Sequence, residues 1–237
     1  MLAESDLRAE LVNACRVLYA CGAAGDGLGG HLSARLGERI LIKPRPVSWW
    51  KLTPEHLIVL DFDGKRVDQP GEPSGVKEWP IHACIYAARP DVNCVFHAHP
   101  ASSTLLAALG ITVEPLDQDC AALTDRLAVL DNGAVSIATP ALGDEVARTL
   151  GSLSTLLIKN HGCVVAGESV AEVCVAAHKL ERVAETMLRA AQLAKLPLLS
   201  PEEKAAILAA RKGVEASSMN QERWRMLQDY YLDRAHD

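Results

Sequence analysis

Residues 93–100 read Asn-Cys-Val-Phe-His-Ala-His-Pro, an apolar run that ends in two histidines, His97 and His99. In a β-strand, residues i and i+2 project from the same face. Both imidazoles can therefore hold one divalent metal ion from the end of a rigid strand. A third histidine, His161, ends another apolar run and precedes Gly162. Three neutral imidazoles leave open coordination positions, which is typical of catalytic metal sites.

The three histidines have a second interpretation, in which they are unrelated and bonded to backbone carbonyls, and spacing alone does not decide. Glu78 favours the metal site because it opens a helix that leads into the His97 strand. A carboxylate beside a metal serves as a fourth ligand or as a proton-transfer group. Its alternative role is to complement the helix dipole. We expect His82, one turn later, to support the site or to lie in the core rather than to bind metal.

Composition limits the functional class. The chain has 237 residues, of which 49% are hydrophobic and only 4% aromatic, and its formal net charge is −6. We expect a single domain over residues 1–237 that ends in helices within 200–233. No basic stripe predicts a nucleic-acid partner, and no apolar run reaches membrane-spanning length. Seven cysteines without a CxxC pair, and no targeting peptide, favour a cytoplasmic protein with free thiols.

Hydrophobic periodicity predicts strands and helices in irregular alternation. The expected strands cover residues 31–35, 40–42, 57–61, 66–67, 94–97, 128–130, 135–137, 155–160 and 163–166. The expected helices cover residues 4–24, 77–88, 101–109, 143–150, 169–194, 200–212 and 219–233. Most of the strands follow one another through hairpins, with helices between the hairpin groups. This order predicts a mixed or antiparallel sheet covered by helices.

An ordered set of motifs carries a family resemblance. The motifs are Gly29-Gly30-His31-Leu32-Ser33-Ala34-Arg35, Glu78-Trp79-Pro80-Ile81-His82, Arg89-Pro90-Asp91-Val92, His97-Ala98-His99 and Asn160-His161-Gly162. With them, residues 5–200 resemble the class II aldolase/adducin family. The resemblance implies an α/β fold, a three-layer α/β/α sandwich with a central mostly antiparallel sheet. It also implies a homotetramer with its sites at subunit interfaces.

The resemblance further implies roles for individual residues. His97, His99 and His161 would bind one divalent metal per subunit, with Zn²⁺ favoured over Mn, Co, Fe or Mg. Glu78 would act as the acid/base residue. Tyr230 or Tyr231, near the C-terminus, would supply a proton donor, since the family often provides a tyrosine there; packing is their alternative role.

The expected substrate follows from departures from the family pattern. Sugar-phosphate aldolases of the family have Asn where this chain has His31, and small hydroxyl residues where it has Val76 and Lys77. These departures favour a small-molecule carboxylate over a phosphate. Taken alone, each basic residue is more simply interpreted as a solvent-exposed cation that binds no ligand. The expected substrate-binding residues are Gly30, His31, Ser33, Lys43, Arg45, Trp49 and Lys77.

These expectations favour a carbon–carbon lyase of the decarboxylase branch, of which dihydroxyphthalate decarboxylase is an example. It would decarboxylate a dihydroxy-aromatic or ring-cleaved dienoic acid through a metal-stabilised enolate. The alternative is a class II aldolase that cleaves a hydroxy-keto acid or a sugar phosphate. A third alternative is an adducin-like scaffold without catalysis, which has no need of a complete set of metal ligands.

Overall fold

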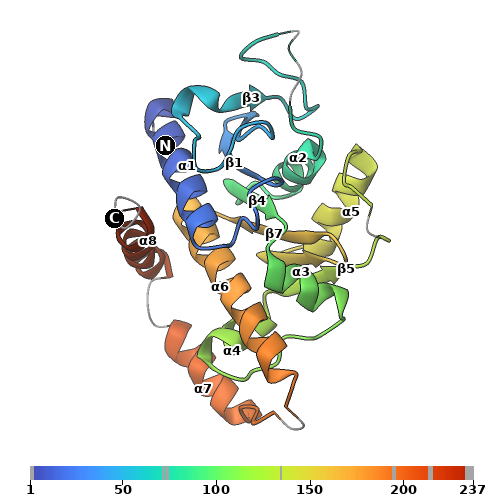
Figure 1. Ribbon diagram of the computed structural model, residues 1–237, viewed down its shortest axis with the longest axis vertical. Helices are drawn as coiled ribbons and strands as arrows, with labels where there is room; N and C mark the ends of the chain where they lie inside the picture. Colours follow the sequence, from blue (N-terminus) through green and yellow to red (C-terminus); the bar gives the residue numbers. More distant parts are fainter. Residues whose placement is uncertain are drawn as a thin grey trace.

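A mixed seven-stranded sheet forms the centre of the molecule (Figure 1). The computed structural model describes residues 3–70, 72, 75–133, 135–193, 196–212 and 216–232. The spatial strand order is β3-β2-β1-β4-β7-β6-β5. The strands are β1 (His31–Leu36), β2 (Arg39–Ile42), β3 (Ile58–Leu60), β4 (Cys94–Ala98), β5 (Leu127–Leu130), β6 (Thr155–Ile158) and β7 (Gly162–Gly167). Neighbours are antiparallel except β5 and β6, which are parallel.

Helices cover both faces of this sheet. They are α1 (Glu4–Ala20), α2 (Trp79–Ala88), α3 (Ala101–Ala108), α4 (Gln118–Thr124), α5 (Pro140–Leu150), α6 (Val170–Ala190), α7 (Pro201–Lys212) and α8 (Ala216–Leu232), with a 3-10 turn at Pro54–His56. Helices α1 and α6 pack on one face, and α2 and α5 on the other. Helix α8 packs against α1 and α6 on their outer side. The expected α/β/α sandwich with a mostly antiparallel sheet is thereby confirmed.

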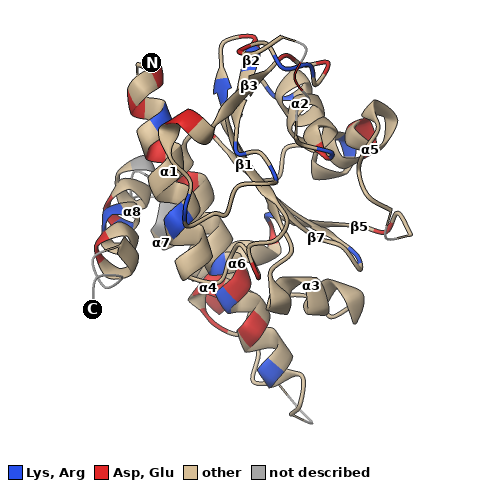
Figure 2. Ribbon diagram, turned by 45° about the horizontal axis from the view of Figure 1, so that its top comes forward, with Lys and Arg blue, Asp and Glu red and all other residues tan. Residues whose placement is uncertain are grey.

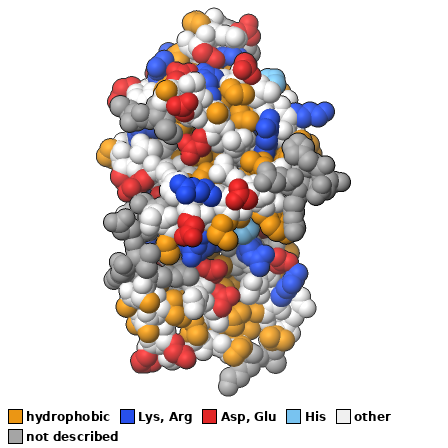
Figure 3. Space-filling view, turned by 90° about the vertical axis from the view of Figure 1, so that its left-hand side faces the viewer, with side chains coloured by type: hydrophobic (Ala, Val, Ile, Leu, Met, Phe, Trp, Pro, Cys, Tyr) orange, Lys and Arg blue, Asp and Glu red, His pale blue; other side chains and the backbone are white. Residues whose placement is uncertain are grey.

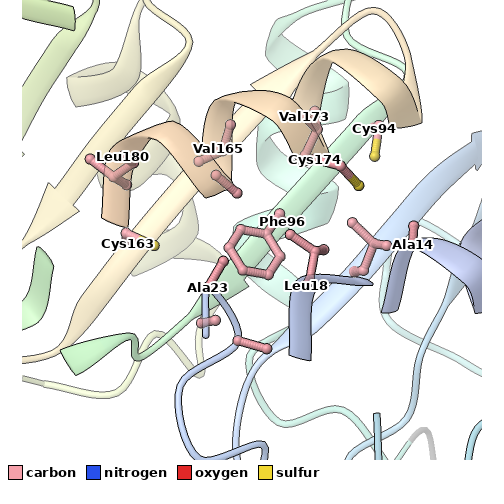
Figure 4. Packing of buried hydrophobic residues seen from close by; sticks show 14 of the residues in the cluster. Ala14, Leu18, Ala23, Cys94, Phe96, Cys163, Val165, Val173, Cys174 and Leu180 are labelled. Carbon is pink, nitrogen blue, oxygen red and sulfur yellow. The ribbon is translucent and has the colours of Figure 1, made fainter. Parts of the chain in front are cut away.

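The layer between the sheet and helices α1 and α6 is apolar. Phe96 of β4 lies at its centre, beside Leu18 of α1 and Cys174 of α6 (Figure 4). All three side chains are fully buried. Since burial of such a side chain contributes about 1.5–3 kcal/mol, this layer stabilises the fold. Most of the sheet carries no charge (Figure 2). Arg35 of β1 and Arg39 of β2 are the charged strand residues, and the other charged residues of the described ranges lie on helices and loops.

Side chains of β4 alternate between the two layers. Phe96 faces α1 and α6, whereas Val95 joins the cluster that contains Ile81 and Ile85 of α2. His97 lies two residues after Val95, so its side chain projects from the same face of the sheet, toward α2. The strand therefore fixes both the apolar centre of one layer and a histidine in the other.

Several predicted boundaries need correction. Residues 135–137 form no strand, and their predicted strand is instead a loop that reaches Glu78. Helix α4 was not predicted, and α5 begins at Pro140 rather than 143. The expected strand at 66–67 is reduced to a single bridge between Leu60 and Arg66. Helix α6 ends at Ala190, and the predicted helix ends at 194 and 233 lie outside the described residues.

The C-terminal end of the first predicted helix also needs correction. The first helix ends at Ala20 rather than at residue 24 because Gly22 and Gly25 adopt positive φ angles. Across the described ranges, every helix is too short or too polar to cross a membrane.

Candidate metal centre

Four side chains converge at one end of the sheet. Glu78, His97, His99 and His161 each offer a ligand atom, and these atoms all lie within 4.8 Å of one another. His97 and His99 come from the end of β4, and His161 from the turn between β6 and β7. Glu78 is the N-cap residue of α2. The structure thus brings together the four residues that the sequence predicted as metal ligands and acid/base.

The Glu78 carboxylate faces the histidines rather than the backbone of its own helix. It makes no capping hydrogen bond to α2. Its Oε2 lies 3.2 Å from His97 Nε2, and its Oε1 lies 3.3 Å from His161 Nε2. The Glu78 side chain is 11% exposed. Burial raises its pKa, but hydrogen bonds with His161 and His97, each formed when a proton lies between ring and carboxylate, outweigh burial and hold the pKa well below its usual range. Glu78 is therefore a carboxylate at neutral pH.

A loop after β5 holds this carboxylate from the other side. Ser136 Oγ and the backbone N–H of Ile137 each donate to Glu78 Oε1 at 2.9 Å. These two donors orient the carboxylate toward His97 and His161. Their region was predicted as a strand, and no sequence signal marked Ser136 as a partner of Glu78.

The tautomer of His97 follows from its second ring nitrogen. His97 Nδ1 lies 2.9 Å from the carbonyl oxygen of Cys163, so Nδ1 carries the proton and donates it. In the neutral ring, Nε2 then presents a lone pair to the Glu78 carboxylate. His97 Nε2 and Glu78 Oε2 are then both hydrogen-bond acceptors, and their 3.2 Å separation requires a cation or a proton between them. A backbone carbonyl behind a ligating histidine is a common support for metal sites.

The turn that carries His161 adopts an unusual backbone. Asn160 has φ 57°, in the left-handed region, and the N–H of His161 donates to Ile158 O at 3.1 Å. Asparagine tolerates this region better than most residues. The tight turn directs the imidazole toward Glu78, while its Nδ1 is buried without a hydrogen-bond partner among the described residues.

Two glycines leave space for His99. A Cβ atom at Gly29 would lie 2.8 Å from His99 Nδ1, and one at Gly162 would lie 2.7 Å from His99 Cδ2. Neither position therefore accepts a larger residue without displacing the ring. Burial, together with the neighbouring His97 and His161, lowers the pKa of His99 to about 4. His99 is thus neutral at pH 7, as a metal ligand must be.

A residue of helix α6 fixes the segment that follows His99. Helix α3 begins two residues after His99, and the N–H groups of Ser102 and Ser103 donate to the Glu181 carboxylate at 2.7 and 2.9 Å. This contact fixes the start of α3 and thus the end of the histidine segment. The sequence contains no local signal for it, because Glu181 lies about 80 residues away.

A buried polar network lies beside the four-residue cluster. Ser33 Oγ hydrogen-bonds to His82 Nδ1 at 2.7 Å and to Tyr86 OH at 2.8 Å. His31 Nδ1 lies 3.0 Å from the carbonyl oxygen of Lys43, and its ring packs edge-on against His82. Burial lowers the pKa of His31 to about 3 and that of His82 well below its ordinary value. His31 pairs with His97 across β1 and β4, so it adjoins the cluster.

Three other predicted substrate-binding residues have mainly packing contacts. Gly30, with φ 81°, brings β1 against β4, since a Cβ there would lie 2.6 Å from His97 O. Lys43 is 1% exposed and its Nζ lies 5.0 Å from the ring centre of Trp49. Trp49 is fully buried in the α1 layer, edge-on to Phe96. The structure does not bring Lys43 and Trp49 to the cluster, because the hydrophobic layer holds both.

The remaining predicted residues divide into two groups. Arg45 and Lys77 are both exposed, and the Arg45 N–H donates to Gly75 O at 3.0 Å, which places their segments side by side. Tyr230 and Tyr231 lie on α8, where Tyr231 packs near His178 of α6. Within one chain, α8 is on the other side of the sheet from Glu78, so the structure does not bring these tyrosines to the cluster.

The donor set fits a divalent metal ion. Three imidazoles and one carboxylate are ligands that zinc accepts, and three protein histidines are common at catalytic zinc. The lone pair of His97 facing the carboxylate is explained by a cation between them. His97, His99 and His161 would hold the ion, with Glu78 beside it. Mn, Co and Fe accept imidazole as well, and carboxylate suits Mg and Mn.

Comparisons with known proteins agree with this architecture. Residues 9–188 match the model of the Class II Aldolase and Adducin N-terminal domain. The chain is 28% identical over 205 residues to a 5-methylthioribulose-1-phosphate/5-deoxyribulose-1-phosphate aldolase of Escherichia coli, covering 85% of this chain and 93% of that protein. It is 27% identical to an L-fuculose phosphate aldolase of Escherichia coli, covering 85% and 92%.

The fold is also similar to that of a solved structure. An aldolase II superfamily protein from Pseudomonas syringae superposes with a TM-score of 0.85 and 24% identity, covering 96% of this chain and 93% of the other. Both of these relatives from Escherichia coli are named as aldolases, which corrects the expectation that the chain stands closest to a decarboxylase branch. The match over residues 9–188 shows that this chain belongs to the class II aldolase and adducin family.

Proposed function

We propose that this protein is a divalent-metal-dependent lyase of the aldolase type, which cleaves a hydroxy-carbonyl compound of the sugar-phosphate class. The observation that carries the proposal is the convergence of Glu78 with His97, His99 and His161. A bound divalent cation acts as a Lewis acid that stabilises the enolate charge formed when a carbon–carbon bond breaks. Zinc is the favoured metal, with Mn, Co, Fe and Mg as alternatives.

Glu78 is placed to move the proton in this reaction. In retro-aldol cleavage, a base takes the proton from the hydroxyl of the carbon that becomes the aldehyde. The electrons of the broken carbon–carbon bond then pass to the carbonyl fragment, whose carbon later takes a proton. Glu78 is a buried carboxylate held by Ser136 and Ile137, and it can accept the first proton and return it.

Two exposed cations are suited to an anionic substrate group. Arg45 and Lys77 lie on segments joined by the hydrogen bond from Arg45 N to Gly75 O, and Lys77 directly precedes Glu78. Guanidinium and ammonium groups bind phosphate and carboxylate alike. We assign the anionic end of the substrate to Arg45 and Lys77. His31 and Ser33 lie beside the cluster and shape its inner wall.

The same two cations favour a second candidate, loss of carbon dioxide from a hydroxylated carboxylate. Decarboxylation leaves the same kind of enolate, with carbon dioxide as the departing fragment in place of an aldehyde. Val76, which is 1% exposed, and Lys77 precede Glu78 and provide no hydroxyl for a phosphate. The aldolase hypothesis takes precedence because the two relatives from Escherichia coli are named as aldolases of phosphorylated sugars.

A direct assay distinguishes the two reactions. The purified, zinc-loaded protein would be incubated with ketose 1-phosphates and, separately, with dihydroxybenzoates and dihydroxyphthalates. We expect aldehyde release from a ketose 1-phosphate that stops on addition of a chelator and returns with Zn²⁺. Release of carbon dioxide without aldehyde would replace the proposal by its second candidate. Metal-bound protein that cleaves no member of either panel would contradict both, and would favour the scaffold reading.

The assembly is part of the proposal. We propose a homotetramer with the sites between subunits, in which Tyr230 or Tyr231 of one subunit supplies a proton donor to its neighbour. Light scattering of the eluting protein would give four times the chain mass. A monomer with full lyase activity would contradict this arrangement.

A further inference from the structure

A cavity of about 280 Å³ lies between α4, α6 and α8, on the side of the sheet away from the metal centre. Its volume is close to the lower bound of about 300 Å³ for small-molecule sites. Figure 3 shows the side of the molecule on which α8 lies, where basic, acidic and hydrophobic side chains are interspersed. The proposed lyase reaction makes no use of this cavity within one chain.

The acidic side chains of the cavity are already engaged. The Asp117 carboxylate accepts hydrogen bonds from the backbone N–H groups of Asp119 and Cys120, at the N-terminus of α4. Asp119 forms an ion pair with Lys179 of α6 at 3.1 Å. The backbone donors stabilise the Asp117 carboxylate, and Lys179 offsets the charge of Asp119. With Arg182 and Arg223, the basic side chains of the wall outnumber the acidic ones.

Two arginines remain in the cavity wall. Arg182 lies on α6, three residues after Lys179, and Arg223 lies on α8, so two helices bring them together. Within the described ranges, neither guanidinium has a carboxylate within ion-pair distance. Guanidinium groups bind carboxylate and phosphate with two parallel hydrogen bonds. The charge of the cavity therefore suits an anion.

The rest of the wall is apolar. Val175 and Val183 of α6 are 4% and 3% exposed and form its inner side. Met226 of α8 is 64% exposed although it lines the cavity beside Leu227. Methionine adapts its shape to different apolar partners. An occupant with an apolar part would remove this surface from water.

We propose that the cavity between α4, α6 and α8 binds a small amphipathic organic anion, with its carboxylate or phosphate group on Arg182 and Arg223 and its apolar part on Val175, Val183 and Met226. His178 lies in the same wall. Burial lowers the pKa of His178, as do Arg182 and Lys179, so the ring is neutral at pH 7 and can donate one hydrogen bond to the anion.

Isothermal titration calorimetry on the full-length, zinc-loaded protein tests this site. The probes are hexanoate, hexyl phosphate and inorganic phosphate. We expect at least one hexyl anion to bind at least 10-fold more tightly than inorganic phosphate. The preferred head group tells a carboxylate site from a phosphate site. Equal affinity for inorganic phosphate and both hexyl anions, or no binding of any probe at 1 mM, would overturn the proposal.

Matched variants locate the binding. Arg182→Gln and Arg223→Gln should each weaken hexyl-anion binding at least about 10-fold, since each removes a charged hydrogen-bond partner. The controls are Arg189→Gln, which lies further along α6 in an ion pair with Glu185, and Arg225→Gln on the exposed side of α8. Both controls should bind like the unmodified protein. Unchanged affinity in both cavity variants, with unchanged circular dichroism, would overturn the assignment.

Discussion

The two faces of the sheet bury different kinds of side chain. Toward α1 and α6, strand β4 presents Phe96 to an apolar layer that includes Leu18 and Cys174. Toward α2, the same strand presents His97, which is fully buried and faces a carboxylate. Burying polar groups costs free energy unless each finds a partner. Opposite sides of one strand therefore contribute to stability and to the candidate metal centre, and we expect substitutions to separate the two.

The largest effect is expected on the α2 side. His97→Ala should reduce bound zinc from about one ion per chain to near zero. It should also lower lyase activity more than about 100-fold. Loss of a residue that only supports a metal ligand costs roughly 10- to 100-fold, and loss of the ligand itself should cost more. The metal content by mass spectrometry and the initial rate are the measurements. The control is His56→Ala, since His56 is an exposed histidine remote from the cluster. Full zinc occupancy in His97→Ala would remove His97 from the site.

The opposite face should respond in stability alone. Leu18→Ala leaves a cavity beside Phe96 and should lower the free energy of unfolding by about 2–5 kcal/mol. Urea denaturation followed by circular dichroism gives this value. Zinc per folded chain should stay unchanged. If Leu18→Ala lost metal as completely as His97→Ala, the two faces would not be separable as the comparison requires.

The loop behind Glu78 should have an intermediate effect on activity. Ser136→Ala removes the 2.9 Å hydrogen bond to Glu78 Oε1 and leaves the Ile137 N–H in place. Activity should fall about 10-fold, at the lower end of the range for outer partners, with zinc still bound. Ser152→Ala, at an exposed serine, is the control. Activity equal to that of the control would show that Ser136 does not position the carboxylate.

The smallest effect concerns acid stability of the metal-free protein. Native His31 has a pKa of about 3, below the ordinary value of 6.5, so only the unfolded chain takes up its proton between these values. The free energy of unfolding therefore falls as pH drops from 6.5 toward 3, by up to about 1.4 kcal/mol per pH unit for one histidine. Urea titrations at several pH values, with a chelator present, should show a shallower slope for His31→Asn. An identical slope would indicate that His31 is not buried in its neutral form.

The sequence predicts those features of the fold and the site that depend on residue spacing within one strand or one turn. The i, i+2 spacing of His97 and His99 predicts two histidines on one face, and the structure brings them together with His161 and Glu78. The alternation along β4 likewise predicts a buried apolar layer opposite them. The sheet, its antiparallel character and most helices follow from periodicity, because burial on one face imposes a repeat on the residues themselves.

The rest depends on contacts between distant segments. Nothing in residues 131–137 marks Ser136 and Ile137 as donors to Glu78, 58 and 59 residues away. Trp49 and Lys43 look like a substrate wall in the sequence, but packing against the α1 layer buries both. The sequence position of a polar or aromatic residue near a motif does not show on which face of the sheet its side chain will be buried. Arg45 and Lys77 remain predicted substrate contacts.

A crystal structure of the zinc-soaked protein, with anomalous diffraction recorded at the zinc edge, would show whether the three histidines hold the ion. We expect one strong anomalous peak per chain, with nitrogen atoms of His97, His99 and His161 at about 2.0–2.1 Å. A saturated protein with no peak among these three histidines, or with its zinc held elsewhere, would contradict it.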